Sequence, residues 1–292
     1  MNRRITVTDN QPLLDYLLSA IALKRSAVKN LLKFGAVQVN GTIVRQFDHL
    51  LMPGDEVIVG NLQAAASIGQ LERARIRVIY EDESLIAVDK PSGLLTVAND
   101  REHADTLDVR LNSYLRGRNA ATPDCALVTH RLDQETSGLV LFAKNQSVKR
   151  LLQDAWPTVE KIYYAVVRGQ PEQDQGTVSN YLSEDRKSLN VFASDRPLPH
   201  SRSATSHYRL LKTYGGRSLV EVRLETGRKH QIRVQLANIG CPVIGDRRYG
   251  DRSKEIDRLA LHSGRLLLAH PLTGERLIFT SPLPRSLRKL LG

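Results

Sequence analysis

Residues 130–138 carry the side chains of this chain that are best placed to do chemistry. They read His-Arg-Leu-Asp-Gln-Glu-Thr-Ser-Gly, with the carboxylate of Asp133 two positions after the guanidinium of Arg131. An ionised carboxylate can act as a nucleophile or as a general base. Carboxylates are seldom kept beside apolar segments without a partner. The alternative from these residues alone is structural, an Asp whose side chain accepts N–H groups of its own turn.

The flanking segments are expected to position this carboxylate. Alternation over residues 128–132 predicts a strand, and Thr-Ser-Gly at residues 136–138 predicts a break in it. The apolar run at residues 139–143 predicts a fully buried strand. Asp133 would then lie in a polar turn at the mouth of a hydrophobic sheet.

Residues 130–138 resemble the signature of the RluA-type pseudouridine synthases, enzymes that isomerise uridine within RNA. The family pattern H-R-L-D-x-x-T-S-G stands here without a departure. The resemblance implies that Asp133 is the catalytic residue. A second long match, Thr-Gly-Arg-Lys-His-Gln-Ile-Arg at residues 226–233, supports it. In all, the resemblance runs from about residue 78 to about residue 284.

The same resemblance implies roles for three further residues. Tyr163, the third residue of Lys-Ile-Tyr, is implied to be the active-site tyrosine beside the uracil. Arg233 is implied to be the ion-pair partner of Asp133. Arg131 is implied to fill the stack vacated by the flipped uridine, a task that suits a flat guanidinium. His130 is expected to be a structural hydrogen-bonder.

Two of these assignments have structural alternatives. Tyr163 could be a half-buried strand tyrosine, although Tyr164, on the opposite face, is preferred for that part. Arg233 could be a surface charge on a helix. Otherwise we expect its guanidinium within roughly 2.7–3.5 Å of an Asp133 oxygen, donating two parallel bonds. Such a cation would keep a carboxylate ionised in a cleft that excludes water.

Pseudouridine formation is an isomerisation, so no redox cofactor, metal or small-molecule cosubstrate is expected. The sequence contains no phosphate-loop pattern, no dinucleotide fingerprint and no His/Cys ligand cluster. By the resemblance, Asp133 could attack ribose carbon 1 or remove a proton from carbon 2. Both routes need one ionised Asp, and the sequence does not choose between them.

The composition favours a polyanionic partner. The 292 residues carry a net charge of +11, which points to nucleic acid first and to an acidic membrane surface second. No apolar run approaches the roughly 20 residues that span a bilayer, and the start lacks a signal peptide's apolar core. Cys125 and Cys241 are far apart and fit a reducing compartment. We therefore expect a cytoplasmic monomer that binds RNA and no membrane.

Residues 1–60 are predicted to form a small α/β module with two helices and a hairpin at Asn40-Gly41. Arg25, Lys29 and Lys33 recur every four residues on one face of the second helix. The order of elements resembles the alpha-L RNA-binding module of a ribosomal small-subunit protein. We predict that these cations contact RNA phosphates. The alternative is a solvated helix face.

Residues 61–75 are small and polar and predict a linker to a catalytic domain at residues 76–292. Many strand patterns with few long helices predict an α+β fold. Residues 105–115 and a segment capped by Asn145 are predicted helices, as are residues 230–238. The resemblance implies a central mixed, mostly antiparallel sheet crossed by the active cleft, with ribosomal RNA preferred over transfer or messenger RNA.

Two other functions compete with the synthase. A non-catalytic RNA-binding or ribosome assembly protein would explain the charge and the amino-terminal module. It would not explain Asp133, Tyr163 and Arg233 standing together in their motifs. A nucleosidase or glycosidase would usually present two carboxylates flanking the bond, and Glu135 offers a second one only within the same turn.

Overall fold

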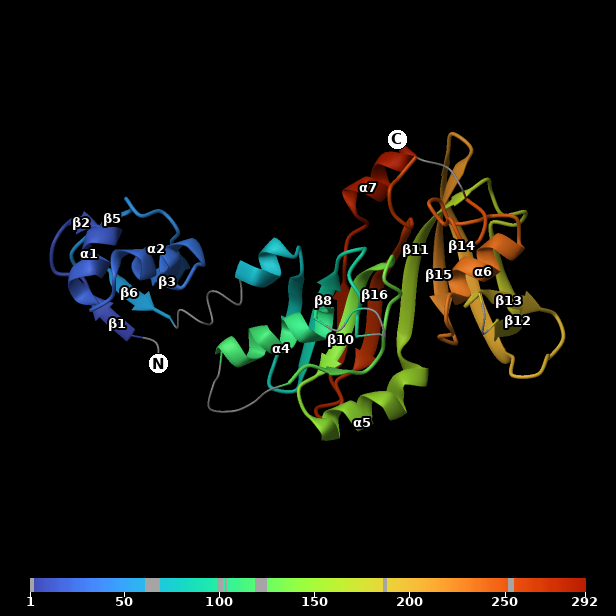
Figure 1. Cartoon of the computed structure of the whole chain (residues 1–292), viewed down its shortest axis with the longest axis horizontal. Coiled ribbons are helices and arrows are strands. Elements are labelled where there is room, and N and C mark those ends of the chain that lie inside the picture. Colours follow the sequence, from blue (N-terminus) through green and yellow to red (C-terminus); the bar gives the residue numbers. More distant parts are fainter. Residues whose placement is uncertain are drawn as a thin grey trace. The chain divides into compact units, whose positions relative to one another are not determined.

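The computed structural model (Figure 1) describes residues 3–60, 69–98, 102, 104–118, 125–185, 188–251 and 255–292. The chain divides into two compact units. The first contains Met1–Ile76 and Asp108–Ala126, and the second contains Arg77–Leu107 and Leu127–Gly292. Within the part of the chain that the structure describes, no helix is both long and apolar enough to cross a membrane.

The first unit is built on a small antiparallel sheet with two helices. Its strand order is β1-β6-β3-β4, from Arg3–Thr6, Glu56–Val59, Val37–Val39 and Thr42–Ile43, while β2 (Gln11–Pro12) pairs with β5 (Leu50–Leu51). Asn40 and Gly41 join β3 to β4 with φ angles of 50° and 78°, the left-handed pair that a tight hairpin turn requires. The predicted hairpin is confirmed.

Two helices bury apolar faces on this small sheet. They are α1 (Leu13–Ala20) and α2 (Arg25–Lys33). The buried face of α2 contains Val28, Leu31 and Leu32. The cations at positions 25, 29 and 33 lie on its exposed face, as the four-residue spacing predicts.

The second unit is organised by one sheet in which 11 strands are described (Figure 1). The main order is β13-β12-β14-β15-β11-β16-β10-β8-β7, with β17 beside β16 and β9 beside β10. Every pair is antiparallel except β10 with β16, so the mixed, mostly antiparallel sheet is confirmed. The strands are β7 (Arg77–Glu81), β8 (Leu85–Lys90), β9 (Leu127–Val128), β10 (Ser137–Ala143), β11 (Glu160–Arg168), β12 (Gln175–Glu184), β13 (Val191–Ser194), β14 (Arg202–Tyr214), β15 (Arg217–Leu224), β16 (Leu261–Ala269) and β17 (Arg276–Thr280).

Helices cover different parts of this sheet. Helix α5 (Gln146–Ala155) packs on β10, and α6 (Gln231–Asn238) packs on β13. Asn145 accepts the Val148 N–H at 2.9 Å and caps α5, which confirms the predicted start. A short helix α7 (Arg285–Arg288) runs near the C-terminus. The predicted helix at residues 105–115 is α4 (Leu107–Arg118), which belongs to the first unit from Asp108 onward.

Two local predictions around the central motif are wrong. The strand predicted at residues 128–132 ends at Val128, and residues 136–138 do not break a strand, because β10 already begins at Ser137. Gly138 has φ +113°, and a Cβ there would lie 2.2 Å from the Ser263 carbonyl oxygen. The glycine is therefore needed for the close approach of the parallel strand β16, not for a turn.

The predicted linker is only partly described. Residues 61–68 lie outside the described residues, whereas residues 69–73 are helical and Leu71 is buried. The small, polar composition of this segment therefore predicted neither the helical turn nor the burial of Leu71. The domain limits at residues 60 and 76 stay a prediction.

Candidate active site

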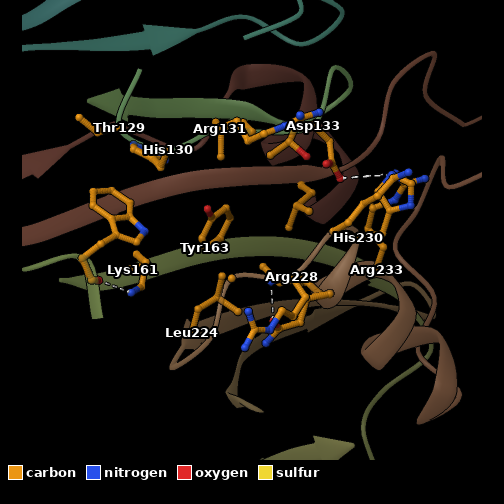
Figure 2. Close-up of a pocket in the computed structure, with 18 of the residues that line it drawn as sticks. Thr129, His130, Arg131, Asp133, Lys161, Tyr163, Leu224, Arg228, His230 and Arg233 are labelled. Atoms are coloured by element: carbon orange, nitrogen blue, oxygen red, sulfur yellow. Dashed lines mark hydrogen bonds and ion pairs between the residues drawn. The ribbon is translucent and has the colours of Figure 1, made fainter. Parts of the chain in front are cut away.

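A cavity of about 600 Å³ lies in the second unit beside the central motif (Figure 2). Three segments supply most of its lining. They are residues 129–136 between β9 and β10, residues 156–163 leading into β11, and residues 227–233 at the start of α6. Each of the three segments contributes charged side chains to the lining.

The segment that follows β9 is attached to β10 by two side chains. Thr129 Oγ1 donates to the Leu141 carbonyl at 2.6 Å, and His130 Nε2 accepts the Leu141 N–H at 3.0 Å. Two side chains thus replace the ladder bonds that a longer strand would make. Burial lowers the pKa of His130 to about 3, and its ring stacks on Trp156 at 4.3 Å between centroids. The structural role expected for His130 fits this geometry.

Residues 90–96, at the end of β8 and in the loop after it, bond to the turn that carries Asp133. Lys90 is fully buried, and its ammonium donates to the carbonyl oxygens of Pro91, Leu94 and Gln134 at 2.7–3.1 Å. Burial lowers the pKa of Lys90 to about 7. Further bonds between the two loops join Ser92 Oγ to the Glu135 carbonyl, Thr96 Oγ1 to the Leu132 carbonyl and the Gly93 N–H to the Gln134 carbonyl. The backbone beside Asp133 is therefore fixed by several bonds to this loop.

The carboxylate of Asp133 is not used to close its own turn. The Thr136 N–H bonds to the backbone carbonyl of Asp133 at 3.1 Å, so the structural alternative of a side-chain-closed turn is wrong. Its side chain is 27% exposed, and two groups approach Oδ2: Arg233 Nη1 at 3.6 Å and His230 Nε2 at 3.8 Å. Figure 2 shows the carboxylate pointing toward both. The motif thus presents an accessible carboxylate to the cavity.

Arg233 is brought to Asp133, but it is not bonded to it as expected. Its two short bonds go to Asp246, from Nε to Oδ2 at 2.7 Å and from Nη2 to Oδ1 at 2.8 Å. The predicted bidentate pair of Arg233 with Asp133 at 2.7–3.5 Å is therefore wrong, because the nearest distance between the two side chains is 3.6 Å. Asp246 has a fully buried side chain and needs a charged partner more than the partly exposed Asp133 does. The surface-charge alternative for Arg233 is also wrong, because its side chain is 9% exposed.

His230 caps the start of α6 in a left-handed conformation, with φ 55°. Its Nδ1 lies 2.7 Å from the Tyr249 hydroxyl, whose ring also lies 5.1 Å from the Arg233 guanidinium carbon. Burial lowers the pKa of His230. Arg233, Arg248 and Lys229 lower it further, against the attraction of Asp133. The imidazole is therefore neutral near pH 7.

Tyr163 projects from β11 into the same cavity (Figure 2) and is 9% exposed. Burial raises its pKa to about 12, and the negative charge of Asp133 adds to this. Its neighbour Tyr164 covers Gly264 on β16, where a Cβ would lie 2.4 Å from the tyrosine ring. Tyr163 is thus the cavity tyrosine and Tyr164 the packing one. Arg131 is exposed at the cavity wall.

The central part of the chain matches a known family. The profile described as RNA pseudouridylate synthase covers residues 84–238, which include the Asp133 loop and most of the cavity wall. The chain belongs to the RNA pseudouridylate synthase family. It is therefore an isomerase that acts on uridine in RNA.

Curated relatives extend the likeness over nearly the whole chain. An uncharacterised RNA pseudouridine synthase of Bacillus subtilis, YhcT, is 30% identical over 97% of this chain and 93% of its own length. A ribosomal large subunit pseudouridine synthase D of Pseudomonas aeruginosa is 32% identical over 92% of this chain and 87% of its own. Human RNA pseudouridylate synthase domain containing 4 shares the fold, with a TM-score of 0.61, 24% identity, and 77% and 94% coverage.

Several residues of this synthase site were not predicted from the sequence. His230, Asp246 and Tyr249 all stand within stretches that carry the family resemblance, but nothing in their spacing ties them to Asp133. Lys90 could have been noticed as a cation at the end of a strand that begins with four apolar residues, because a buried Lys needs acceptors. Arg25, Lys29 and Lys33 belong to the other unit and do not line this cavity.

Proposed function

We propose that this protein converts specific uridines of structured RNA to pseudouridine, with the ionised carboxylate of Asp133 as the catalytic group and no cofactor. The observation that carries this is the position of that carboxylate. It lies at a cavity wall, on a clamped turn, with Arg233 and His230 near one oxygen. Tyr163 and Arg131 line the same space, where Tyr163 would contact the uracil and Arg131 would replace the flipped base.

Two routes use the same group. In the first, an Asp133 oxygen bonds to ribose carbon 1 while the bond to uracil N1 breaks and leaves its electron pair on the base. In the second, the carboxylate removes the proton of carbon 2, and the same bond breaks. In both, uracil C5 then bonds to carbon 1. In the first route the bond from carbon 1 to the Asp133 oxygen breaks as this bond forms, and in the second the protonated Asp133 returns its proton to carbon 2. C5 then loses its proton and N1 gains one.

Ribosomal RNA is the target class that we favour. One relative over most of the chain is named for the large ribosomal subunit. The exposed cations of α2, at positions 25, 29 and 33, would bind the phosphate backbone of such an RNA. The free cysteines Cys125 and Cys241 fit a cytoplasmic location.

The test compares the wild type with Asp133→Asn on unmodified ribosomal RNA transcripts. Asn keeps the shape of the side chain but has no ionised oxygen, so turnover should be abolished while RNA affinity stays within a few-fold. Pseudouridine is measured by mass spectrometry, and Glu135→Gln, the neighbouring exposed carboxylate, is the matched control that should keep its activity.

Each contrary outcome identifies a different error. Activity of Asp133→Asn within tenfold of the wild type would reject Asp133 as the catalytic group. RNA binding without any pseudouridine from the wild type would favour the non-catalytic RNA-binding or ribosome assembly protein. Release of free uracil would favour a nucleosidase.

A further inference from the structure

We propose that His230 is a positioning residue that donates a hydrogen bond from Nε2 to Asp133 Oδ2, and that Tyr249 fixes the imidazole tautomer that makes this possible. The inference rests on the proposed role of Asp133. It adds two residues, from the cap of α6 and from the segment after that helix, to the machinery of the reaction.

The tautomer follows from the Tyr249 hydroxyl. Its oxygen accepts the Val191 N–H at 3.0 Å and lies 2.7 Å from His230 Nδ1. A backbone N–H can only donate, and among the described residues no other acceptor is bonded to this hydroxyl. Because Nδ1 is the only acceptor bonded to it among the described residues, we assign the single hydroxyl hydrogen to the bond with Nδ1. A neutral imidazole that accepts at Nδ1 carries its proton at Nε2.

The Nε2–H then faces the reactive carboxylate. Nε2 is the imidazole atom nearest Asp133, at 3.8 Å from Oδ2, and the His230 side chain is 10% exposed. This distance is about 1 Å longer than a hydrogen bond. Such contacts are often long before substrate binds and shorten in the complex. A small movement of Asp133 toward α6 would close the bond.

Burial first, and then the surrounding cations, keep this donor neutral by lowering the pKa of His230. Arg233, Arg248 and Lys229 are the cations that act on the imidazole, and its place at the amino-terminal end of α6 also disfavours positive charge. A neutral donor orients the carboxylate without adding a second full charge beside Arg233. An additional cation would stabilise the carboxylate and weaken it as a base or nucleophile.

The arrangement also distinguishes the two Asp133 oxygens. Arg233 Nη1 and His230 Nε2 both make their nearest approach to Oδ2. With Oδ2 held by two donors, Oδ1 is the oxygen presented for reaction. His230 and Arg233 would thus set the direction of attack as well as the charge state.

The first test uses three variants with the wild type and Asp133→Asn alongside. His230→Leu removes the donor and should lower kcat about 100-fold with KM within threefold. His230→Gln keeps a donor near the Nε2 position and an acceptor for Tyr249, so it should recover kcat to within about tenfold of the wild type. Tyr249→Phe should lower kcat by an intermediate factor. Equal kcat loss in His230→Leu and His230→Gln, or a loss confined to KM, would overturn the proposal.

The second test reads the tautomer directly by ¹⁵N NMR of labelled imidazoles at pH 8. His130, which accepts at Nε2, and His270, which accepts the Leu272 and Thr273 N–H groups at Nδ1, provide reference signals for the two tautomers. His230 should match His270 in the wild type and lose that preference in Tyr249→Phe. A His230 signal that matches His130 would overturn the proposal. This readout needs no turnover, so it is independent of a failure of the proposed function.

Discussion

The guanidinium of Arg233 gives its two short bonds to Asp246 and leaves Nη1 at 3.6 Å from Asp133. One cation therefore lies between two carboxylates, with the buried one bound bidentately and the accessible one approached end-on. Asp246 fixes the plane of the guanidinium. Asp133 receives the charge of Arg233 without being locked into a bidentate bond, so it can still move onto a substrate.

Replacing Arg233 should cost both stability and activity. Arg233→Ala would strand the buried charge of Asp246, so we expect a loss of roughly 3–5 kcal/mol in the free energy of unfolding. Arg233→Lys cannot bond both Asp246 oxygens and reach Asp133, and should rescue only part of the loss. Urea unfolding followed by the fluorescence of Trp156, the only tryptophan, measures the second unit.

The control for this pair is Arg209→Ala, which breaks an exposed bond to Glu221 of 2.9 Å. Arg209 is 60% exposed, so its loss should change the free energy of unfolding by about 1 kcal/mol or less. Similar effects of Arg233→Ala and Arg209→Ala would show that the Arg233–Asp246 pair is not a buried determinant of the site.

Gly138→Ala tests the close approach of β10 and β16. The new Cβ would meet the Ser263 backbone at 2.2–2.8 Å, in addition to the strain of φ +113°. Gly274→Ala is the matched control, because its φ is +72° and nothing lies within 4 Å of its Cβ. The control should lose about 1–2 kcal/mol from strain alone. Gly138→Ala should lose clearly more by thermal or urea unfolding, and an equal loss would contradict the packing explanation.

Lys90→Met should remove a pH dependence of stability. Burial lowers the pKa of Lys90 to about 7 in the folded chain, whereas the unfolded chain keeps a value of about 10.4. Between these values the unfolded chain binds more protons, so the contribution of Lys90 to the free energy of unfolding rises with pH. The difference between wild type and Lys90→Met should grow by about 2 kcal/mol from pH 7 to pH 9 in favour of the wild type.

Urea unfolding at pH 6, 7, 8 and 9 measures this difference. The control is Lys289→Met, which removes one exposed lysine near the C-terminus and so separates the effect of burial from the loss of a charge. A flat difference for Lys90→Met would mean that the buried ammonium keeps its ordinary pKa.

The salt dependence of RNA binding tests the cations of α2. Replacing Arg25, Lys29 and Lys33 by Gln should reduce the slope of log affinity against log salt by about 2–3, because each lost phosphate contact contributes about 0.7–0.9. The exposed cations Arg276, Arg285 and Arg288, changed to Gln together, provide a control of equal charge on the other unit. A greater loss of slope in the control would place the phosphate contacts on the second unit.

The sequence by itself determined the features that depend on local pattern. The period of α2 placed its cations opposite Val28, Leu31 and Leu32, and Asn40-Gly41 fixed the β3–β4 hairpin through two left-handed residues. The apolar run at residues 139–143 predicted a buried strand, and it forms the fully buried part of β10. The motifs also predicted that Arg131, Asp133, Tyr163 and Arg233 would meet at one cavity, because the motifs match those of a known family.

Only the tertiary structure decided how those side chains are partnered. The competition of Asp133 and Asp246 for Arg233 depends on which carboxylate is fully buried, and burial is a property of the packed sheet. His230 lies nearly a hundred residues after Asp133 in the sequence. It reaches Asp133 because α6 packs on β13. The end of β9 at Val128 depends likewise on the side chains of Thr129 and His130, which bond to Leu141 in place of the backbone. Such bonds join positions at least 11 residues apart, and local periodicity carries no information about them.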